Sequence, residues 1–377
     1  MMTRTRLTVL AAGVAIALTG CPPEPETYEA ETVPLKAFPG ALLNNHGEIA
    51  GIHTEDMLED GVPAAGIWKD GVFTPLDPPE DTEVQLKHFN DTGIVVGRLG
   101  PRADSPLHLW GEPRGEGKTV LPPPPHHALS HIFGLNNHAD MTGWAPDPIE
   151  NGSGFIQGKP MRIWADGEAE ELPEFEAPED KEYTYRSRPT GINDEGVVAG
   201  TALANLVDSG EMYPLVWNAG GLIELSTGPR RFGRTADLNN EGWIVGAVHD
   251  GGSFGFGPPA LDDGLAAVWR PDGILHTLRR DGWNLRGTPG ITNGNSVLTI
   301  YQTPTGEEPV QFKTVVWEWD PVAETFAPYN VAEGTDLEDA EDLSFIGIDI
   351  NDAGQILARV SEPGSEEWRL YLLTPAE

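Results

Sequence analysis

A nine-residue phrase recurs along almost the whole chain of 377 residues, and its clearest copy is INDEGVVAG, from Ile192 to Gly200. The other copies begin at Leu43, Phe89, Leu135, Leu238, Ile291 and Ile350. The first Asn of the phrase, replaced by Thr292 in the sixth copy, returns every 46 to 59 residues. This period suits units of four short strands, and such units fold as one body because each buries its core against its neighbours.

Each phrase precedes an apolar run that ends in tryptophan. These tryptophans are Trp68, Trp110, Trp164, Trp217, Trp269, Trp317 and Trp368. Several are followed by a polar turn and another alternating run. Each unit is therefore predicted to contain strand A, a tight Asn-x-x-Gly turn, strand B, a variable loop, strand C ending near Trp, a second tight turn and strand D.

The Asn-x-x-Gly turn has a physical basis. Asn bonds its side chain to nearby backbone, and Gly in the fourth position accepts the left-handed conformation. Ala139 and Asn295 replace this glycine in the third and sixth copies. Ala139 is the awkward replacement, because Asn tolerates a positive φ better than Ala.

A second glycine follows the first Asn by seven residues in five copies. These are Gly51, Gly97, Gly143, Gly200 and Gly246. Glycine inside a strand marks a bulge or a close backbone approach, so we expect a packing role here.

Seven such units predict an all-β fold, a seven-bladed β-propeller of four-stranded antiparallel blades over residues 31–377, with the tryptophans between blades. The last unit ends in EEWRLYLLTPAE, which leaves no room for strand D. The segment ETVPL, from Glu31 to Leu35, matches strand D of the first unit. We therefore expect the N-terminal strand to complete the last blade, which removes two open sheet edges.

The Asn-Gly phrase followed by an apolar run ending in Trp, as in PLVW and LAAVW, resembles the HAF-type repeats of bacterial extracellular proteins. Of the His-Ala-Phe-Leu-Trp run common in that family, only the Trp is kept. The resemblance implies an exported repeat protein of mostly undefined function, and it transfers no catalytic residue.

The N-terminus has the pattern of an export signal. Arg4 and Arg6 precede an apolar run too short to span a bilayer as a permanent helix, so residues 1–20 are predicted to be a signal peptide. The run ends in Leu-Thr-Gly-Cys, which resembles the lipobox of bacterial lipoproteins. Cys21, the single cysteine, is therefore the expected lipidation site; the alternative is a plain secretory signal with an incidental cysteine.

Residues 21–30 are acidic and proline-rich, and we expect them to form a short tether that holds the propeller close to its membrane. The expected location is the bacterial cell envelope, facing the periplasm or the cell surface. The chain carries 59 acidic and 24 basic residues, a net charge of −35. Such a surface repels nucleic acid and anionic lipid, so the lipid anchor is the expected membrane contact, and we expect a monomer.

Arginines are concentrated in three neighbouring segments that we assign to the D–A connections after blades three, four and five. They are Arg186, Arg188, Arg230, Arg231, Arg234, Arg279, Arg280 and Arg286. Long variable loops share one face of the predicted propeller, where binding sites usually lie. Arginine grips carboxylate, sulfate or phosphate in bidentate fashion, so this group is a candidate anion site. The alternative is that these arginines pair with acids such as Asp237 or Asp281 and only hold loops in place.

Metal sites are weaker candidates. His126, His127 and His131 lie close together and are candidate ligands for Zn²⁺ or Cu²⁺, although their spacing fits no standard site. The acidic segments LDDG, from Leu261, and EGTDLEDAEDL, from Glu333, are candidates for Ca²⁺ but lack the spacing of a calcium loop. Solvated acidic loops and incidental histidines are the alternatives.

No nucleophile elbow, phosphate loop or CxxC motif is present, so the sequence identifies no catalytic residue. It favours a non-enzymatic binding or scaffolding propeller for a protein, peptide or glycan partner. The competing hypothesis is an envelope hydrolase or lyase that acts on an anionic polymer.

Overall fold

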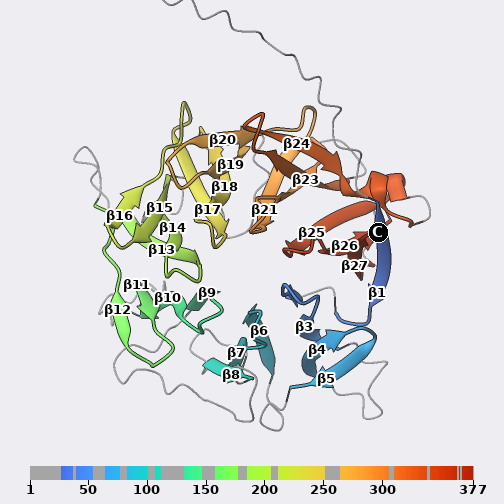
Figure 1. Cartoon of the computed structure of the whole chain (residues 1–377), viewed down its shortest axis with the longest axis horizontal. Coiled ribbons are helices and arrows are strands. Elements are labelled where there is room, and N and C mark those ends of the chain that lie inside the picture. The colour runs from blue at the N-terminus through green and yellow to red at the C-terminus, as the bar shows by residue number, and fades with distance from the viewer. Residues whose placement is uncertain are drawn as a thin grey trace, which may run out of the picture.

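The computed structural model shows a ring of seven small antiparallel sheets around a common axis (Figure 1). It describes residues 27–36, 40–53, 64–76, 83–100, 107–111, 131–146, 158–176, 185–204, 211–250, 264–304, 310–337, 340–362, 365 and 367–376. This arrangement confirms the predicted seven-bladed β-propeller. Within those ranges there is no α-helix, and no helix is long and apolar enough to cross a membrane.

The blades follow the chain in order, each with its strand A innermost. Blades 1 to 3 contain β2 (Leu42–Leu43), β3 (Ile49–Ile52), β4 (Ala65–Lys69) and β5 (Val72–Pro75); β6 (Val84–Phe89), β7 (Val95–Leu99) and β8 (Leu107–Trp110); and β9 (His131–Leu135), β10 (Met141–Pro146), β11 (Gly158–Ile163) and β12 (Ala169–Glu171). Blade 2 has three strands among the described residues, because the segment after it, 112–130, lies outside them.

Blades 4 to 7 continue the pattern. They contain β13 (Tyr185–Ile192), β14 (Val198–Ala204), β15 (Met212–Asn218) and β16 (Gly221–Glu224); β17 (Phe232–Leu238), β18 (Ile244–His249), β19 (Leu265–Trp269) and β20 (Leu275–Leu278); β21 (Asn284–Ile291), β22 (Val297–Gln302), β23 (Phe312–Asp320) and β24 (Thr325–Asn330); and β25 (Ser344–Ile350), β26 (Ile356–Ser361) and β27 (Arg369–Pro375), with β1 (Tyr28–Val33) as the outer strand. Two short 3₁₀ helices, η2 (Val331–Gly334) and η3 (Ala340–Asp342), precede β25.

The N-terminal strand closes the ring, as predicted. Strand β1 pairs with β27 from Tyr28 opposite Pro375 to Val33 opposite Leu370, and Figure 1 shows the two side by side. The strand begins at Tyr28, inside the stretch expected to be tether, because the Tyr28 side chain is fully buried. Its hydroxyl lies 2.5 Å from that of Tyr329 in blade 6. Closure therefore joins the start of the chain to two blades.

Every A–B turn adopts the predicted conformation. The fourth residue has a positive φ in each of the seven turns, at Gly47, Gly93, Ala139, Gly196, Gly242, Asn295 and Gly354. Ala139 (φ 68°) and Asn295 (φ 69°) take the same left-handed backbone as the glycines they replace. The turn geometry is therefore imposed by the repeat even where the residue type opposes it.

The glycine seven residues after the first Asn serves packing. A Cβ on Gly200 would lie 2.4 Å from the Trp217 indole, and one on Gly246 would lie 2.0 Å from the carbonyl oxygen of Arg234. Strand A carries a register shift opposite both glycines. The expected bulge and close approach are thus present.

The tryptophan pattern holds in five blades and fails in two. Trp68, Trp110, Trp217, Trp269 and Trp317 all pair with the residue five after the first Asn and are buried. Ile163 and Leu373 take that position in blades 3 and 7. Trp164 lies one residue beyond it, and Trp368 precedes β27 and packs against Phe312, 6.2 Å between ring centroids. The prediction of one core tryptophan per blade was wrong there because an aliphatic side chain fills the same space.

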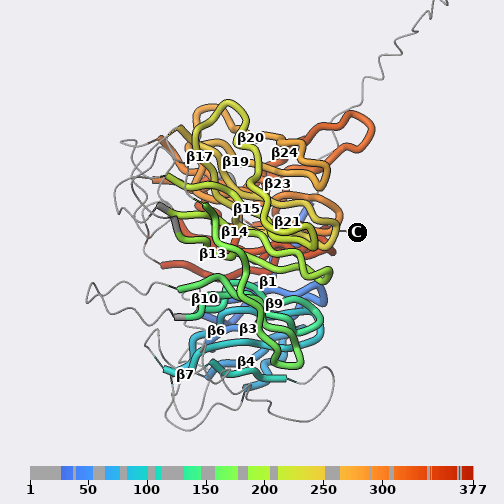
Figure 2. Tube along the Cα trace, turned by 90° about the vertical axis from the view of Figure 1, so that its left-hand side faces the viewer, coloured from blue at the N-terminus to red at the C-terminus, as the bar shows by residue number. Residues whose placement is uncertain are grey.

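The two faces of the disc differ as expected. Seen from the side, the strands run from one face to the other (Figure 2). The antiparallel order places the A–B and C–D turns on one face, which we call the tight-turn face. The B–C and D–A connections share the opposite face, the long-loop face.

Candidate functional site

The first Asn of each turn organises the backbone around it. In blade 1, Asn44 Oδ1 accepts hydrogen bonds from the backbone N–H groups of His46 and Glu48, both at 3.0 Å. The same pattern occurs at Asn136, Asn193, Asn239 and Asn351. A short amide side chain is the group that can bond its own turn in this way.

The same asparagines link neighbouring blades at the axis. Each Nδ2 donates to the carbonyl oxygen of the first residue in the next turn, and we call this set the asparagine ladder. The links are Asn44 to Asn90, Asn90 to Asn136, Asn136 to Asn193, Asn193 to Asn239, Asn239 to Thr292, and Asn351 to Asn44. Thr292 has no amide to donate, so the ladder has six links in seven blades.

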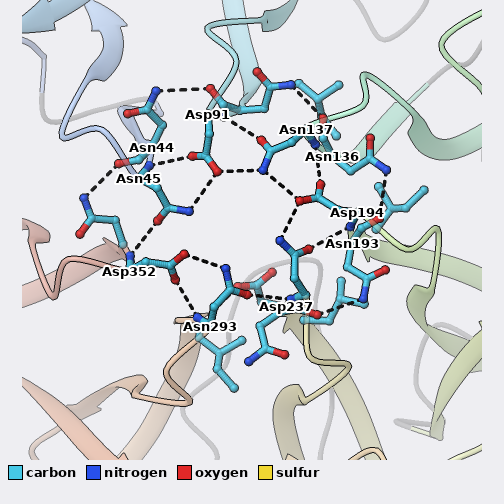
Figure 3. Close-up of a pocket in the computed structure, with 18 of the residues that line it drawn as sticks. Asn44, Asn45, Asp91, Asn136, Asn137, Asn193, Asp194, Asp237, Asn293 and Asp352 are labelled. Carbon is cyan, nitrogen blue, oxygen red and sulfur yellow. Dashed lines mark hydrogen bonds between the residues drawn. The ribbon is translucent and has the colours of Figure 1, made fainter.

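The second residue of each turn forms a closed ring, which we call the amide ring (Figure 3). Its members are Asn45, Asp91, Asn137, Asp194, Asn240, Asn293 and Asp352. The backbone N–H of each donates to the side-chain Oδ1 of the next, and the last donates to the first, at 2.6 to 2.9 Å. Seven bonds therefore run in one direction around the axis.

Asn and Asp alternate around the amide ring except at one place. Asp91 Oδ2 accepts from Nδ2 of Asn45 at 3.0 Å and of Asn137 at 2.8 Å. Asp194 Oδ2 likewise accepts from its two Asn neighbours, at 3.1 and 2.7 Å. An odd number of blades forces one pair of like neighbours, and this pair is Asn240 and Asn293. The sequence thereby avoids two adjacent carboxylates, which would repel each other.

The two sets of turn residues line an axial cavity of about 210 Å³ at the tight-turn face. Apolar residues that end the inner strands, such as Phe89 and Leu135, also border it. Most of the polar groups drawn in Figure 3 bond one another. The polar groups that line the cavity therefore serve mainly to close the ring of blades, not to bind a ligand.

Two enclosed carboxylates near this cavity join further blades. Asp237 of β17 accepts a hydrogen bond at 3.3 Å from the N–H of Ile291 in blade 6, and Asp349 of β25 bonds the backbone of Leu43 in blade 1. Burial raises the pKa of Asp237 to about 6. Burial, then repulsion from Asp237 and from Asp91, raises the pKa of Asp349 to about 7. Asp237 therefore bonds backbone, not an arginine.

The eight candidate arginines divide into two groups. Arg186, Arg188, Arg234 and Arg286 lie on the innermost strands β13, β17 and β21, not in the connections to which the sequence assigned them, because these strands begin earlier than expected. Arg230, Arg231, Arg279 and Arg280 lie in connections. Among them, Arg230 forms an ion pair with Asp250, and exposed Arg279 lies 3.4 Å from Asp281. The structure does not bring all eight together.

Three basic side chains occupy the same position on adjacent inner strands. His131 on β9, Arg188 on β13 and Arg234 on β17 pair with Trp144, Thr201 and Ala247, each eight residues after the first Asn of its turn. All three are partly exposed. They lie in the half of the inner strands nearer the long-loop face, and we call them the basic triad.

Arg188 is the central member of the basic triad. Its guanidinium carbon lies 4.3 Å from the ring centroid of Phe133 and 5.8 Å from that of Trp144, both in blade 3. Its Nε atom is buried and has no hydrogen-bond partner among the described residues. Burial lowers its pKa. Aromatic stacking therefore holds the plane of the guanidinium and leaves an N–H unused.

Positive charge accumulates around the triad. Burial, then the Arg188 charge, lowers the pKa of Arg234. Burial, then the charges of Arg98, Arg188 and Lys87, lowers the pKa of His131. Lys87 and Arg98 belong to blade 2, so basic side chains from four consecutive blades act on one another, and the lowered pKa of His131 favours its neutral form. Sequence reasoning missed these two, since neither occupies the repeat position that His131, Arg188 and Arg234 share.

The described residues do not bring the candidate metal ligands together into a site. His126 and His127 lie outside the described residues, and His131 stacks on Phe133 with ring centroids 5.8 Å apart. Leu261 and the two aspartates after it also lie outside them. In the segment from Glu333, Asp336 Oδ1 accepts from the N–H of Ala30, which fastens β1. Where the structure describes the chain, no cluster of three or more His, Cys, Asp or Glu side chains has metal-binding geometry.

No protein family model matches the chain, and no curated protein matches its sequence. Solved structures with similar folds include dipeptidyl peptidase 4 of Porphyromonas gingivalis, with 11% identity and a TM-score of 0.44, covering 90% of this chain and 53% of that one. A structure of NanB plus Optactamide has 9% identity and a TM-score of 0.34, covering 93% of this chain and 70% of that one. The chain thus spans about half the length of the peptidase. Neither likeness bears on its activity.

Proposed function

We propose that this protein is a membrane-tethered binding or scaffolding module of the cell envelope that holds a protein, peptide or glycan partner against its long-loop face. The long-loop face is favoured over the tight-turn face because the polar groups of the tight-turn face bond one another. At its axis the amide ring and the asparagine ladder bond one another, so these polar groups are already occupied within the fold. The long-loop face carries the variable connections, which are the usual place for binding residues on a rigid scaffold.

The observation that carries the proposal is the basic triad. Placing like charges side by side on partly buried inner strands costs free energy: burial first, and then the charge of Arg188, lower the pKa of Arg234. Groups held at a cost to stability are typical of binding sites.

The competing hydrolase or lyase gains no support from the described residues. Asp237 and Asp349 have raised pKa values of about 6 and 7, the range expected of a general acid. They bond backbone N–H groups near the tight-turn end of the inner strands, away from the triad. A structural role accounts for both.

The proposal is tested by crosslinking from each face. Cys21 is the only natural cysteine, so a single introduced cysteine can carry a photocrosslinker in a chain whose Cys21 is acylated. Arg231→Cys places it in an exposed D–A connection, and Val322→Cys places it in an exposed C–D turn. In detergent-solubilised envelopes, we expect a discrete crosslinked partner from position 231 and none from position 322. Equal crosslinking from both faces would refute the proposal.

The membrane tether rests on Cys21, which lies outside the described residues. We expect metabolic labelling with an alkyne fatty acid to mark the chain and Cys21→Ser to abolish both the label and membrane fractionation. Unchanged labelling in Cys21→Ser would rule out this anchor while leaving the propeller's binding role untouched.

A further inference from the structure

The basic triad has a geometry suited to one small planar anion. Its members come from equivalent positions on three adjacent inner strands, with Arg188 between His131 and Arg234. The hydroxyls of Thr201 in blade 4 and Thr235 in blade 5 lie 3.3 Å apart, and Thr201 Oγ1 accepts from the N–H of Thr235 at 3.1 Å. Strands β14 and β17 are therefore tied together beside Arg188 and Arg234.

Arg188 is pre-oriented for a planar acceptor. Its guanidinium lies over Phe133, so contacts to a ligand are made from the edge of the plane, where the N–H groups point. The side chain is partly exposed while its Nε–H is buried, so a ligand is met by the terminal Nη–H groups. The edge of a guanidinium matches the two oxygens of a carboxylate in a bidentate pair.

The net charge of the protein restricts which ligands can carry that anion to the site. At a net charge of −35, the surface repels polyanions and attracts cationic or neutral chains. A single carboxylate also loses less hydration on entering a partly buried site than a doubly charged sulfate or phosphate. The local and global charges thus favour a lone carboxylate on a body that is not itself acidic.

We propose that His131, Arg188 and Arg234 form a binding site for one carboxylate group, carried by a ligand whose remaining part is neutral or cationic. This inference rests on the proposed binding role of the long-loop face and names the ligand chemistry. The terminal carboxylate of a peptide and the carboxylate of a sugar acid share this chemistry.

The test follows the side-chain N–H signals of arginine by NMR in the full-length protein, at constant ionic strength. N-acetylglycine represents a peptide terminus, glucuronate represents a sugar acid, and N-acetylglycinamide is the uncharged match of the first. We expect saturable shifts of the Arg188 and Arg234 signals with one or both carboxylates and none with the amide. Whichever carboxylate binds tighter identifies the source.

Substitutions locate the site. We expect Arg188→Gln and Arg234→Gln each to weaken carboxylate binding about tenfold or more, as for a lost hydrogen bond to a charged group. The control is Arg279→Gln, an exposed arginine paired with Asp281, which we expect to bind normally. Arg188→Gln can fail to fold because its stacking on Phe133 is lost. In that case the binding test uses Arg234→Gln, after its melting temperature has been shown to be unchanged.

Three results would overturn the inference. They are no saturable shift at about 100 mM of either carboxylate, a concentration that saturates even a site of about 1 mM affinity; tighter binding of inorganic sulfate or phosphate than of both carboxylates; and full binding by both triad variants. If one of these occurs while position 231 still captures a partner, the binding function stands and only the ligand assignment fails. If crosslinking also fails, both fail.

Discussion

Single residues at the axis show how one chemical group, the asparagine amide, serves two purposes in six of the seven turns. The amide of the first turn residue bonds its own turn through oxygen and the next blade through nitrogen. Asn does both, whereas Thr292 does only the first, through the hydroxyl that accepts from the N–H of Ser296 at 3.0 Å. The sixth copy of the phrase, which departs most from the others in sequence, is also the one that breaks the ladder.

The missing link can be supplied. We expect Thr292→Asn to raise the free energy of unfolding by about 0.5 to 1.5 kcal/mol, because the new Nδ2 can donate to the carbonyl oxygen of Asn351. Chemical denaturation measures this change. The matched variant is Asn136→Thr, which removes an existing link and should destabilise; a loss of stability in Thr292→Asn would show that the sixth turn cannot accept the amide.

Ala139 offers a second gain at residue scale. A left-handed backbone costs a non-glycine residue about 1 to 2 kcal/mol. Glycine avoids this cost but loses more conformational entropy on folding, which cancels part of the gain. We expect Ala139→Gly to stabilise the protein by about 0.5 to 1 kcal/mol in thermal or chemical unfolding. Gly93→Ala is the control, since its Cβ would meet nothing within 4 Å and only the φ of 87° is strained; it should destabilise.

At the scale of elements, the last blade depends on a strand from the other end of the chain. Tyr28 is buried at 1% exposure, and its hydroxyl lies against that of Tyr329. We expect Tyr28→Ala to cost about 3 to 5 kcal/mol, as for other large aromatic truncations in cores, and Tyr28→Phe to cost about 1 kcal/mol. Urea unfolding measures both. Equal, small losses would mean that β1 contributes little to closure.

The sequence repeat predicted the strands and turns well, but it predicted less well which side chain fills the space between blades. The Asn-x-x-Gly phrase fixed the A–B turns, since its chemistry is local and leaves few alternatives. The tryptophan rule failed at Trp164 and Trp368 because the interblade space accepts Ile163 or Leu373, and sequence spacing does not reveal which residue pairs in register.

The candidate site was less accessible to sequence reasoning than the fold. Clustering along the chain joined Arg188 and Arg234 to loop arginines such as Arg279, whereas the site depends on equivalent positions in neighbouring blades. Loop lengths before the inner strands vary, so distance along the sequence is a poor guide to distance across the ring. The lipid anchor, the use of metal and the identity of the partner stay predictions, because they depend on segments outside the described residues or on ligands.

At the scale of the molecule, the axis is electrically polar, with carboxylates towards the tight-turn face and cations towards the long-loop face. Burial, Asp237 and Asp91 raise the pKa of Asp349 to about 7, above its ordinary value of 3.8. The folded protein therefore keeps a proton there that the unfolded chain has lost. The resulting contribution to stability is present at low pH and declines as pH rises from about 4 through about 7.

We accordingly expect the melting temperature to fall between pH 5.5 and pH 8 at constant salt, and Asp349→Asn to reduce that fall. Asn keeps the shape without the charge, so the difference between the two pH profiles separates Asp349 and its repulsion from Asp237 from the general repulsion of an acidic protein. Asp70→Asn, at an exposed tight turn of blade 1, is the control and should leave the slope unchanged. Identical slopes in all three proteins would show that Asp349 does not titrate in this range.

The amide ring, finally, has no first or last member, since each of its seven donors points to the next blade and Asp352 returns to Asn45. The covalent break between the termini sits at a blade edge, outside this circuit. The hydrogen bonds at the axis therefore do not depend on which blade comes first in the chain. A circularly permuted chain, joined across its natural ends and opened between any two other blades, would meet the same circuit of donors and acceptors.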